Sequence, residues 1–361
     1  MPSPFTTSDK IIYNPVNMEV RPLSVGIVDF NPKRMSAEEA TAHGIPDELR
    51  PQVADFRQYP LNIARQLPNG VSWYSAEQPW FFRSVMSDET QRKHLAESDI
   101  LILSGSGMSA YQYQEDATHF SPEDQEALRQ TEALIKNHLG EGKWMLGICF
   151  GGQLAMHATG GKLGRLPENS QGHTVTEAGW LEHSLTAAGK VDDVSGMLPD
   201  QFFAPHLHSD YVAALPEVGS VVNTSSGDIL VTKVGVLAVR NGYAGKDGLQ
   251  NENTPYIQMS VVEFDNGAKL YQIQPHPEMA TSEKANFLVR MNKWIANEDE
   301  MGSIYYQRAL EVPSDANFVV AQTITRFTET ARKHLEAERN IHFIDSVLAN
   351  PQVYNYLLVE G

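Results

Sequence analysis

The stretch WMLGICFGGQ (residues 144–153) joins an apolar run to a cluster of small residues. The apolar run is typical of a buried strand, and the glycines indicate a sharp turn into a helix. The only cysteine of the chain, Cys149, stands at this turn. Its spacing, G-x-C-x-G-x-Q, is the cysteine form of the nucleophile elbow, in which a strand-to-helix turn projects a nucleophile above a sheet. We therefore predict that Cys149 is a nucleophile and not an inert buried thiol.

The glycines on either side of Cys149 support this interpretation. Gly147 and Gly151 allow a tight backbone turn and leave no Cβ in the path of a substrate. The first turn of the following helix directs its free N–H groups and its dipole toward the sulfur, which favours a thiolate.

A base and an orienting carboxylate are predicted in the segment LYQIQPHPE (residues 270–278). Prolines on both sides of His276 keep its backbone extended. His276 and Glu278 are two residues apart, so in an extended chain their side chains leave the same face. Glu278 can then hold one ring nitrogen while the other faces a thiol. Taken alone, the segment also fits a strand-end histidine beside a solvated glutamate; the elbow favours the catalytic interpretation.

Six motifs, in order along the chain, make it similar to the class I glutamine amidotransferases. The similarity is strong over residues 99–290 and weaker over 23–98. The motifs are SGSGMS (104–109), GICFGGQ (147–153), GGKLG (160–164), EAGW (177–180), HSDYV (208–212) and QPHPE (274–278).

This resemblance implies a doubly wound α/β fold and a set of site residues. The implied triad is Cys149, His276 and Glu278. The implied oxyanion hole is formed by the backbone N–H groups of Ser106 and Phe150. The implied substrate-binding residues are Gly105, Gln153, Ser209 and Asp210. Two positions depart from the family pattern without removing a catalytic atom: Ser106-Gly107 stands where G-P is usual, and Gly152 where histidine is frequent.

The wider pattern predicts a mostly parallel central sheet with an antiparallel section and a C-terminal helical extension. Apolar runs separated by helical stretches are typical of βαβ units. Closer strands over residues 175–275 indicate hairpins. Expected strands cover residues 23–30, 71–74, 99–103 and 143–148; expected helices cover 56–67 and 281–296; expected turns lie at 226–228 and 265–267.

Three parts of the chain are expected: a tail (1–22), a catalytic domain (23–296) and a helical extension (297–361). Within the extension, one apolar helical stripe is formed by Val320, Ile324, Phe327, Ala331 and Leu335. A second helix is expected over 341–348. The stripe packs on the catalytic domain, or forms a lid or a contact in a homo-oligomer.

Composition narrows the class of protein. The formal net charge of −17 disfavours nucleic acid and anionic membranes as partners. No apolar run is long enough to span a membrane, and the first residues do not resemble a signal peptide. The single cysteine excludes an internal disulfide framework. We expect a cytoplasmic enzyme.

Two rival signals are weak. Residues 105–110 match the dinucleotide fingerprint G-x-G-x-x-A, but a polar, acidic segment follows where an apolar helix should begin. His206 and His208 could pair on a metal, but the sequence shows no carboxylate at ligand spacing. We expect no cofactor and no metal.

Three functions remain open at this point. The first is a glutamine amidotransferase that releases ammonia through a γ-glutamyl thioester on Cys149, for an acceptor or a synthetase partner. The second is a stand-alone hydrolase of γ-glutamyl amides or peptides with the same triad. The third is a catalytically silent binding or regulatory protein.

Overall fold

The computed structural model describes most of the predicted catalytic region and one C-terminal helix. The described residues are 20–30, 63–64, 66–75, 89–168, 172, 174–245, 248–279, 318–340 and 342–343. The expected helix over 281–296 lies outside them, as does most of the expected helix over 56–67, of which residues 63–64 are described as helical.

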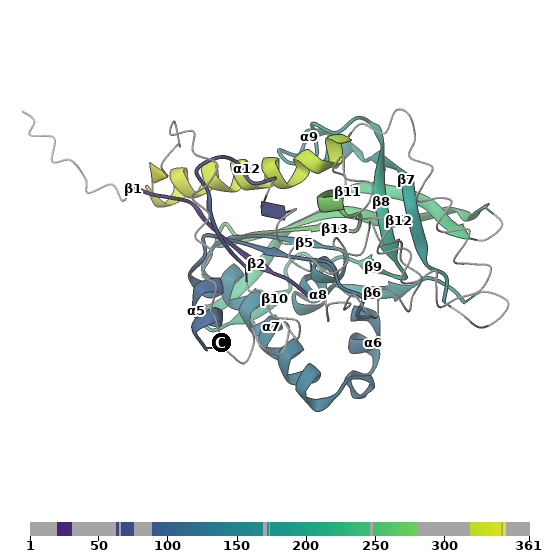
Figure 1. Ribbon diagram of the computed structural model, residues 1–361, viewed down its shortest axis with the longest axis horizontal. Helices are drawn as coiled ribbons and strands as arrows, with labels where there is room; N and C mark the ends of the chain where they lie inside the picture. The colour runs from purple at the N-terminus through teal and green to yellow at the C-terminus, as the bar shows by residue number, and fades with distance from the viewer. Residues whose placement is uncertain are drawn as a thin grey trace, which may run out of the picture.

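One twelve-stranded sheet dominates the described residues, and its first half is parallel (Figure 1). Neighbouring strands β2, β4, β5 and β13 all run in one direction, as the apolar runs predict. The strands of this half, in spatial order, are β3 (Ser72–Ser75), β2 (Ser24–Val28), β4 (Ile100–Leu103), β5 (Trp144–Ile148) and β13 (Lys269–Ile273).

The second half of the sheet is antiparallel and continues from β13, which confirms the predicted hairpin section. Gly227 and Gly267, both with positive φ, lie at the two predicted turns. The strands of this half are β12 (Gly248–Phe264), β11 (Gly227–Gly245), β7 (Glu177–Leu185) and β8 (Gln201–His208), with β6 (Lys162–Arg165), β9 (Asp210–Ala214) and β10 (Val221–Thr224) off the main path.

Helices cover both faces of the parallel half, so the domain has three layers, α/β/α (Figure 1). Alternate residues of β4 define the two faces: Leu101 and Leu103 pack toward α7 and α8, whereas Ile100 and Ile102 pack toward α12. The helices are α5 (Glu89–Glu97), α6 (Ala110–Glu115), α7 (Pro122–Gly140), α8 (Phe150–Ala158), α9 (Ala187–Val191) and α12 (Gln322–Arg339), with short 3₁₀ turns at Ala117–His119, Pro277–Met279 and Phe318–Ala321.

Helix α12 forms the second helical layer and is packed on the sheet. All five residues of the predicted stripe are fully buried. Phe327 packs against Trp144 and Tyr271, with ring centroids 6.3 and 5.6 Å away. The prediction that the stripe packs on the catalytic domain is confirmed, and these five side chains are therefore not available as an oligomer contact.

One expected element is wrong where it can be checked. Residues 342–343 form β14, a short strand that pairs in parallel with β1 (Val20–Arg21), whereas a helix was expected over 341–348. The apolar pattern is local, whereas the pairing of β14 with β1 joins segments more than 300 residues apart in the chain. The rest of that expected helix lies outside the described residues.

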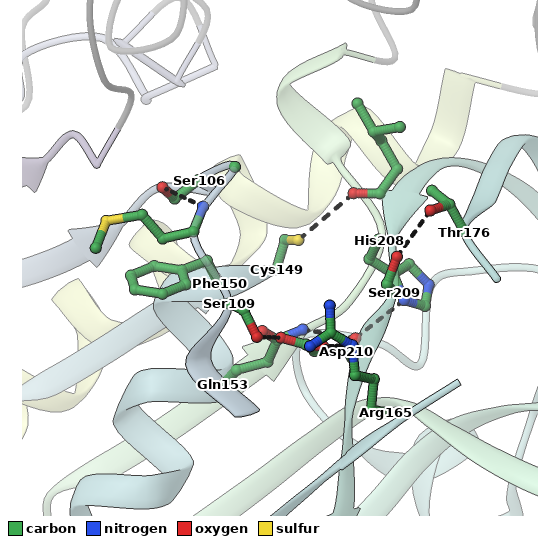
Figure 2. A pocket seen from close by; sticks show the side chains of 13 residues that line it. Ser106, Ser109, Cys149, Phe150, Gln153, Arg165, Thr176, His208, Ser209 and Asp210 are labelled. Carbon is green, nitrogen blue, oxygen red and sulfur yellow. Dashed lines mark hydrogen bonds and ion pairs between the residues drawn. The ribbon is translucent and has the colours of Figure 1, made fainter. Parts of the chain in front are cut away.

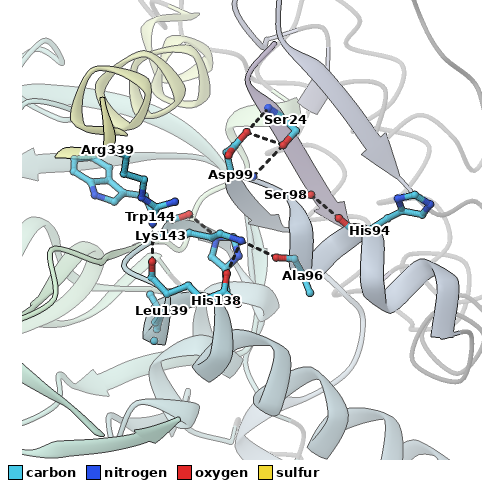
Figure 3. A network of polar contacts seen from close by, with 12 residues as sticks. Ser24, His94, Ala96, Ser98, Asp99, His138, Leu139, Lys143, Trp144 and Arg339 are labelled. Atoms are coloured by element: carbon cyan, nitrogen blue, oxygen red, sulfur yellow. Dashed lines mark hydrogen bonds and ion pairs between the residues drawn. The ribbon is translucent and has the colours of Figure 1, made fainter. Parts of the chain in front are cut away.

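Polar contacts tie the end of the sheet opposite the elbow together (Figure 3). Asp99 accepts hydrogen bonds from the backbone N–H and the hydroxyl of Ser24 and from Arg21. Burial raises the pKa of Asp99, but these hydrogen bonds outweigh it and leave the pKa below its ordinary value. Lys143 Nζ donates to the carbonyl of Ala96 at 2.7 Å. These contacts anchor the start of β2 and β5 and so fix the register of the strands that carry the site.

Candidate active site

Three neighbouring strands end at one edge of the sheet and bring the predicted site residues together. Strand β5 leads into Cys149, β4 into the 104–109 loop, and β13 into His276. Because β4 and β13 flank β5 on either side, residues far apart in the chain meet at the carboxyl ends of parallel strands. Ligands of open α/β sheets bind in this position.

The backbone of Cys149 has the strained conformation of a nucleophile elbow. Its φ of 49° and ψ of −116° lie in a region that residues with a Cβ seldom occupy. Cys149 is the N-cap of α8 and makes no side-chain capping bond there. Gly147 has no room for a side chain, because a Cβ on it would overlap Gly152 of α8. The strand and the helix therefore meet at a close contact that only glycine permits.

His276 and Glu278 form a buried pair beside the elbow. Nδ1 of His276 lies 2.7 Å from Oε1 of Glu278, while Nε2 of His276 has no hydrogen-bond partner among the described residues. Burial alone would lower the pKa of His276, but the negative charge of Glu278 and the sulfur of Cys149 outweigh it and raise the pKa to about 10. The imidazole is thus held by Glu278 on one side and kept free on the other.

Gly105 lies close to both His276 and Cys149. A Cβ at this position would be 2.7 Å from Cε1 of His276 and 3.5 Å from Cβ of Cys149. Gln274, which precedes the His-Pro-Glu sequence, donates its side-chain N–H to the sulfur of Cys149 at 3.5 Å. These contacts show that the ends of β4, β5 and β13 converge on one point.

Side-chain bonds fasten the 104–109 loop. The hydroxyl of Ser106 donates to the carbonyl of Phe30 at 2.8 Å and accepts from the N–H of Met108 at 3.1 Å. The N–H of Phe30 in turn donates to the hydroxyl of Ser104 at 2.9 Å. Phe150 is the first residue of α8, so its N–H has no acceptor within the helix. Ser106 thus supplies anchoring bonds to a loop in which Gly107 stands where proline is usual in the family pattern.

A cavity of about 80 Å³ opens over the elbow (Figure 2). Six of the predicted site residues line it: Ser106, Cys149, Phe150, Gln153, Ser209 and Asp210. Gly105, His276 and Glu278 do not line it. The other lining residues are Gly107, Met108, Ser109, Arg165, Thr176, Leu207 and His208.

Polar side chains cover the cavity wall away from the thiol. Asp210 accepts a hydrogen bond from Ser109 at 2.5 Å through its carboxylate, and one from the Gln153 amide at 2.7 Å through its backbone carbonyl. Nε of Arg165 lies 3.7 Å from the second carboxylate oxygen, Oδ1, of Asp210. Neither of these two atoms has a hydrogen-bond partner among the described residues, and they face each other as an ion pair.

Sequence reasoning missed several residues in or beside the cavity. Gln274 was quoted within the QPHPE motif but not given a contact with sulfur. Arg165 directly follows the GGKLG motif and Thr176 directly precedes EAGW, so adjacency to motifs was the available signal. Thr176 meets the hydroxyl of Ser209 at 2.8 Å.

One cluster of metal-ligand types lies beside the cavity. Ligand atoms of Glu177, His206 and His208 all lie within 4.8 Å of one another, and all three residues are buried. The sequence analysis set this histidine pair aside because no carboxylate was evident; the structure places Glu177 next to it.

No helix in the described part of the chain is long and apolar enough to cross a membrane.

Comparison with known families gives one match. The family model described as glutamine amidotransferase class-I matches residues 84–241. Residues 84–241 belong to the class-I glutamine amidotransferase family. This amidotransferase region contains Cys149 and every residue that lines the cavity, whereas His276 and Glu278 follow it in the chain.

Three solved structures illustrate what the backbone is similar to. A glutamine amidotransferase from Thermotoga maritima is 14% identical, with 86% of this chain and 98% of that chain covered and a TM-score of 0.49. A glutamine amido transferase from Methylobacillus flagellatus is 15% identical, with 88% and 94% covered and a TM-score of 0.43. The glutaminase domain of CTPS from Trypanosoma brucei, with bound acivicin, is 11% identical, with 81% and 97% covered and a TM-score of 0.39. The search of curated proteins gives no match.

Proposed function

We propose that the chain is a glutaminase-type amidotransferase that hydrolyses the side-chain amide of glutamine through a thioester on Cys149. The observation that carries this proposal is the strained backbone of Cys149 at the N-terminus of α8, with the His276–Glu278 pair and a small polar cavity beside it. A positive φ at a non-glycine residue is strain that active sites retain for function.

In the first half of the reaction, the sulfur of Cys149 attacks the amide carbon of glutamine. A C–S bond forms, and the electron pair of the carbonyl moves onto oxygen. His276, carrying a proton, then gives it to the departing nitrogen as the C–N bond breaks, so that ammonia leaves. The raised pKa of His276 keeps this proton in place at neutral pH.

The second half hydrolyses the thioester. His276, now neutral at Nε2, takes a proton from water as the water oxygen attacks the γ-carbonyl carbon. The C–S bond breaks, glutamate leaves, and the sulfur and the imidazolium are restored. Throughout, Glu278 orients the ring through the 2.7 Å contact with Nδ1 and stabilises its positive charge.

The tetrahedral oxyanion is stabilised by backbone donors at the cavity end nearest the thiol. The N–H of Phe150 begins α8, and the N–H of Ser106 belongs to the loop held by its own hydroxyl. Removing one donor of this kind from an enzyme costs about 10²–10³ in rate. Gly105, Gln153, Ser209 and Asp210 are the residues that we assign to the substrate's amino-acid head.

The use of the released ammonia requires an activated acceptor. The sequence contains no G-x-x-x-x-G-K-[ST] phosphate loop, so activation of an acceptor by nucleotide falls to another protein. We therefore propose a synthetase or acceptor subunit as partner. The alternative is direct hydrolysis of a γ-glutamyl amide or peptide, which the same residues perform without a partner.

One experiment separates these functions. The purified chain is supplied with glutamine and with a panel of γ-glutamyl amines, and release of ammonia or amine is measured. Slow glutamine hydrolysis that a candidate synthetase accelerates supports the amidotransferase, and fast turnover of a γ-glutamyl amine supports the hydrolase. If no compound is turned over with any partner, and no electrophile labels Cys149, the catalytic proposal is rejected.

A further inference from the structure

Three buried side chains beside the cavity have the arrangement of a metal site. Nε2 of His208 lies 3.0 Å from Nδ1 of His206 and 3.2 Å from Oε2 of Glu177. At ordinary Zn–N and Zn–O bond lengths, the ligand atoms of a tetrahedral zinc ion lie about 3.3 Å apart. These two separations are therefore close to those of ligands that share one ion, and all three ligand atoms lie within 4.8 Å of one another.

Strand pairing explains how these residues meet. Glu177 of β7 is directly opposite His208 of β8, and His206 is opposite Gly179. Since side chains two residues apart on a strand share a face, Glu177, His206 and His208 all project to one side of this ladder. Gly179 has a φ of 105° and no side chain, so the β7 residue paired with His206 places no side chain against it.

Each of the three residues also has a hydrogen-bond partner outside the cluster. Nδ1 of His208 lies 3.0 Å from the carbonyl of Asp210; because a carbonyl can only accept, this nitrogen carries the hydrogen, and a neutral His208 presents a lone pair at Nε2. Oε1 of Glu177 accepts from Nε of Arg240 at 3.0 Å. Such outer partners orient metal ligands and fix their tautomers.

The third residue is held in the same way by another histidine. Nε2 of His206 lies 2.7 Å from Nε2 of His183, and the two rings are stacked with centroids 4.7 Å apart. One of these nitrogens must carry a hydrogen, and when it is that of His206, its Nδ1 presents a second lone pair toward Nε2 of His208. Two lone pairs and a carboxylate oxygen then face one point, an arrangement that a cation completes. In the other tautomer, Nδ1 of His206 donates a hydrogen bond to Nε2 of His208.

We propose that Glu177, His206 and His208 bind a divalent transition-metal ion of the zinc type. Two imidazoles and one carboxylate are a donor set that zinc accepts, with a fourth position left for water. Glu177 and His208 belong to the EAGW and HSDYV motifs, whereas His206 lies outside all six motifs. The third ligand is therefore supplied by a position that the family resemblance does not explain.

The site has a direct structural consequence for the cavity. His208 lines the cavity wall, and the carbonyl of its neighbour Leu207 lies 3.9 Å from the sulfur of Cys149. The carbonyl of Pro205, on the same strand, accepts from the N–H of His276 at 2.9 Å. A metal ion that links β7 to β8 therefore stiffens the strand that contacts both Cys149 and His276.

The test uses the full chain carrying Cys149→Ala, because zinc also binds thiolates and would otherwise report on the nucleophile. The protein is stripped with chelator and titrated with Zn²⁺ and Co²⁺, with calorimetry, thermal unfolding and the visible absorption of cobalt as readouts. We expect one ion per chain, a rise in Tm and the intense absorption of four-coordinate cobalt. We expect His206→Asn to weaken binding by about 100-fold or more, beyond the 10–100-fold effect typical of an outer partner.

The matched control is His119→Asn, because His119 is exposed and far from the cluster in sequence; binding should be unchanged. Circular dichroism and the metal-free Tm show whether His206→Asn is folded, and Glu177→Gln provides a second ligand variant. The proposal would be overturned if the parent protein failed to bind one equivalent of metal. It would also be overturned if both ligand variants bound the metal as tightly as the parent protein.

Discussion

Gly105 lies directly against the ring of His276: a Cβ placed on Gly105 would be 2.7 Å from Cε1 of that histidine. The ring is not free to move away, since its Nδ1 is held by Glu278. The shape of the site therefore depends on a glycine that carries no catalytic atom.

The first prediction follows from this contact. Gly105→Ala should displace His276 and lower the rate of ammonia release by about 100-fold, the cost of an ångström-scale misplacement of a reacting group, while the protein stays folded. Gly107→Ala is the control, because a Cβ there meets nothing within 4 Å. Steady-state kinetics measure the rate of ammonia release, and circular dichroism shows whether each variant is folded. Equal rates for the two variants would contradict the prediction that Gly105 must leave room for His276.

The second prediction separates the base from the residue that orients it. His276→Asn should remove most of the chemical rate, whereas Glu278→Gln should cost less, because it keeps a hydrogen-bond acceptor beside Nδ1 and loses the charge. Single-turnover kinetics report the chemical step apart from product release. Near wild-type turnover in both variants would make His276 a structural strand-end residue.

The third prediction concerns pH and stability. The folded pKa of His276 is raised to about 10, so the folded chain keeps a proton that the unfolded chain loses near pH 6.5. The stabilisation from this group is complete below about pH 6.5 and declines as pH rises toward about 10. Denaturant unfolding of wild type and His276→Asn should show a stability difference that shrinks across this window. A difference that grows with pH would contradict the assignment.

The fourth prediction tests whether α12 is a layer of the domain. Phe327 is fully buried between Trp144 and Tyr271, so Phe327→Ala should destabilise the protein by about 3–5 kcal/mol. Lys333→Ala, on the exposed face of the same helix, should change stability by less than about 0.5 kcal/mol. Chemical denaturation measures both.

Deletion of residues 316–361 extends this test, because it exposes the apolar face of the sheet that α12 covers. We expect loss of solubility or a change in oligomeric state. A truncated chain of unchanged mass, solubility and rate would show that the helix has no structural role.

The parallel strands and the elbow could be predicted because their signals are local. Residues 100–103 and 144–148 are continuous apolar runs, and Cys149 stands in a dense glycine motif. Where a segment packs is a long-range property, and prediction was poorer there. The spacing of the α12 stripe identified its apolar face but left its partner open, and the pairing of β14 with β1 has no local signal at all.

The candidate site shows the same limit. The His276–Glu278 pair could be anticipated because its members are two residues apart. The approach of Glu177 to His208 depends on the register of β7 with β8, and no periodicity in either strand encodes that register. Arg165 and Gln274 were missed for the same reason, since their neighbours in space are distant in the chain.

The thioester is the most direct test of the central claim. Wild-type protein is mixed with glutamine or the best γ-glutamyl substrate, quenched in acid during turnover, and analysed by intact and peptide mass spectrometry. The account predicts one γ-glutamyl group per chain, attached to the peptide that contains Cys149, and its accumulation in His276→Asn if water activation is slowed more than acylation. Turnover without this adduct, an adduct on another residue, or activity retained by Cys149→Ala would contradict it.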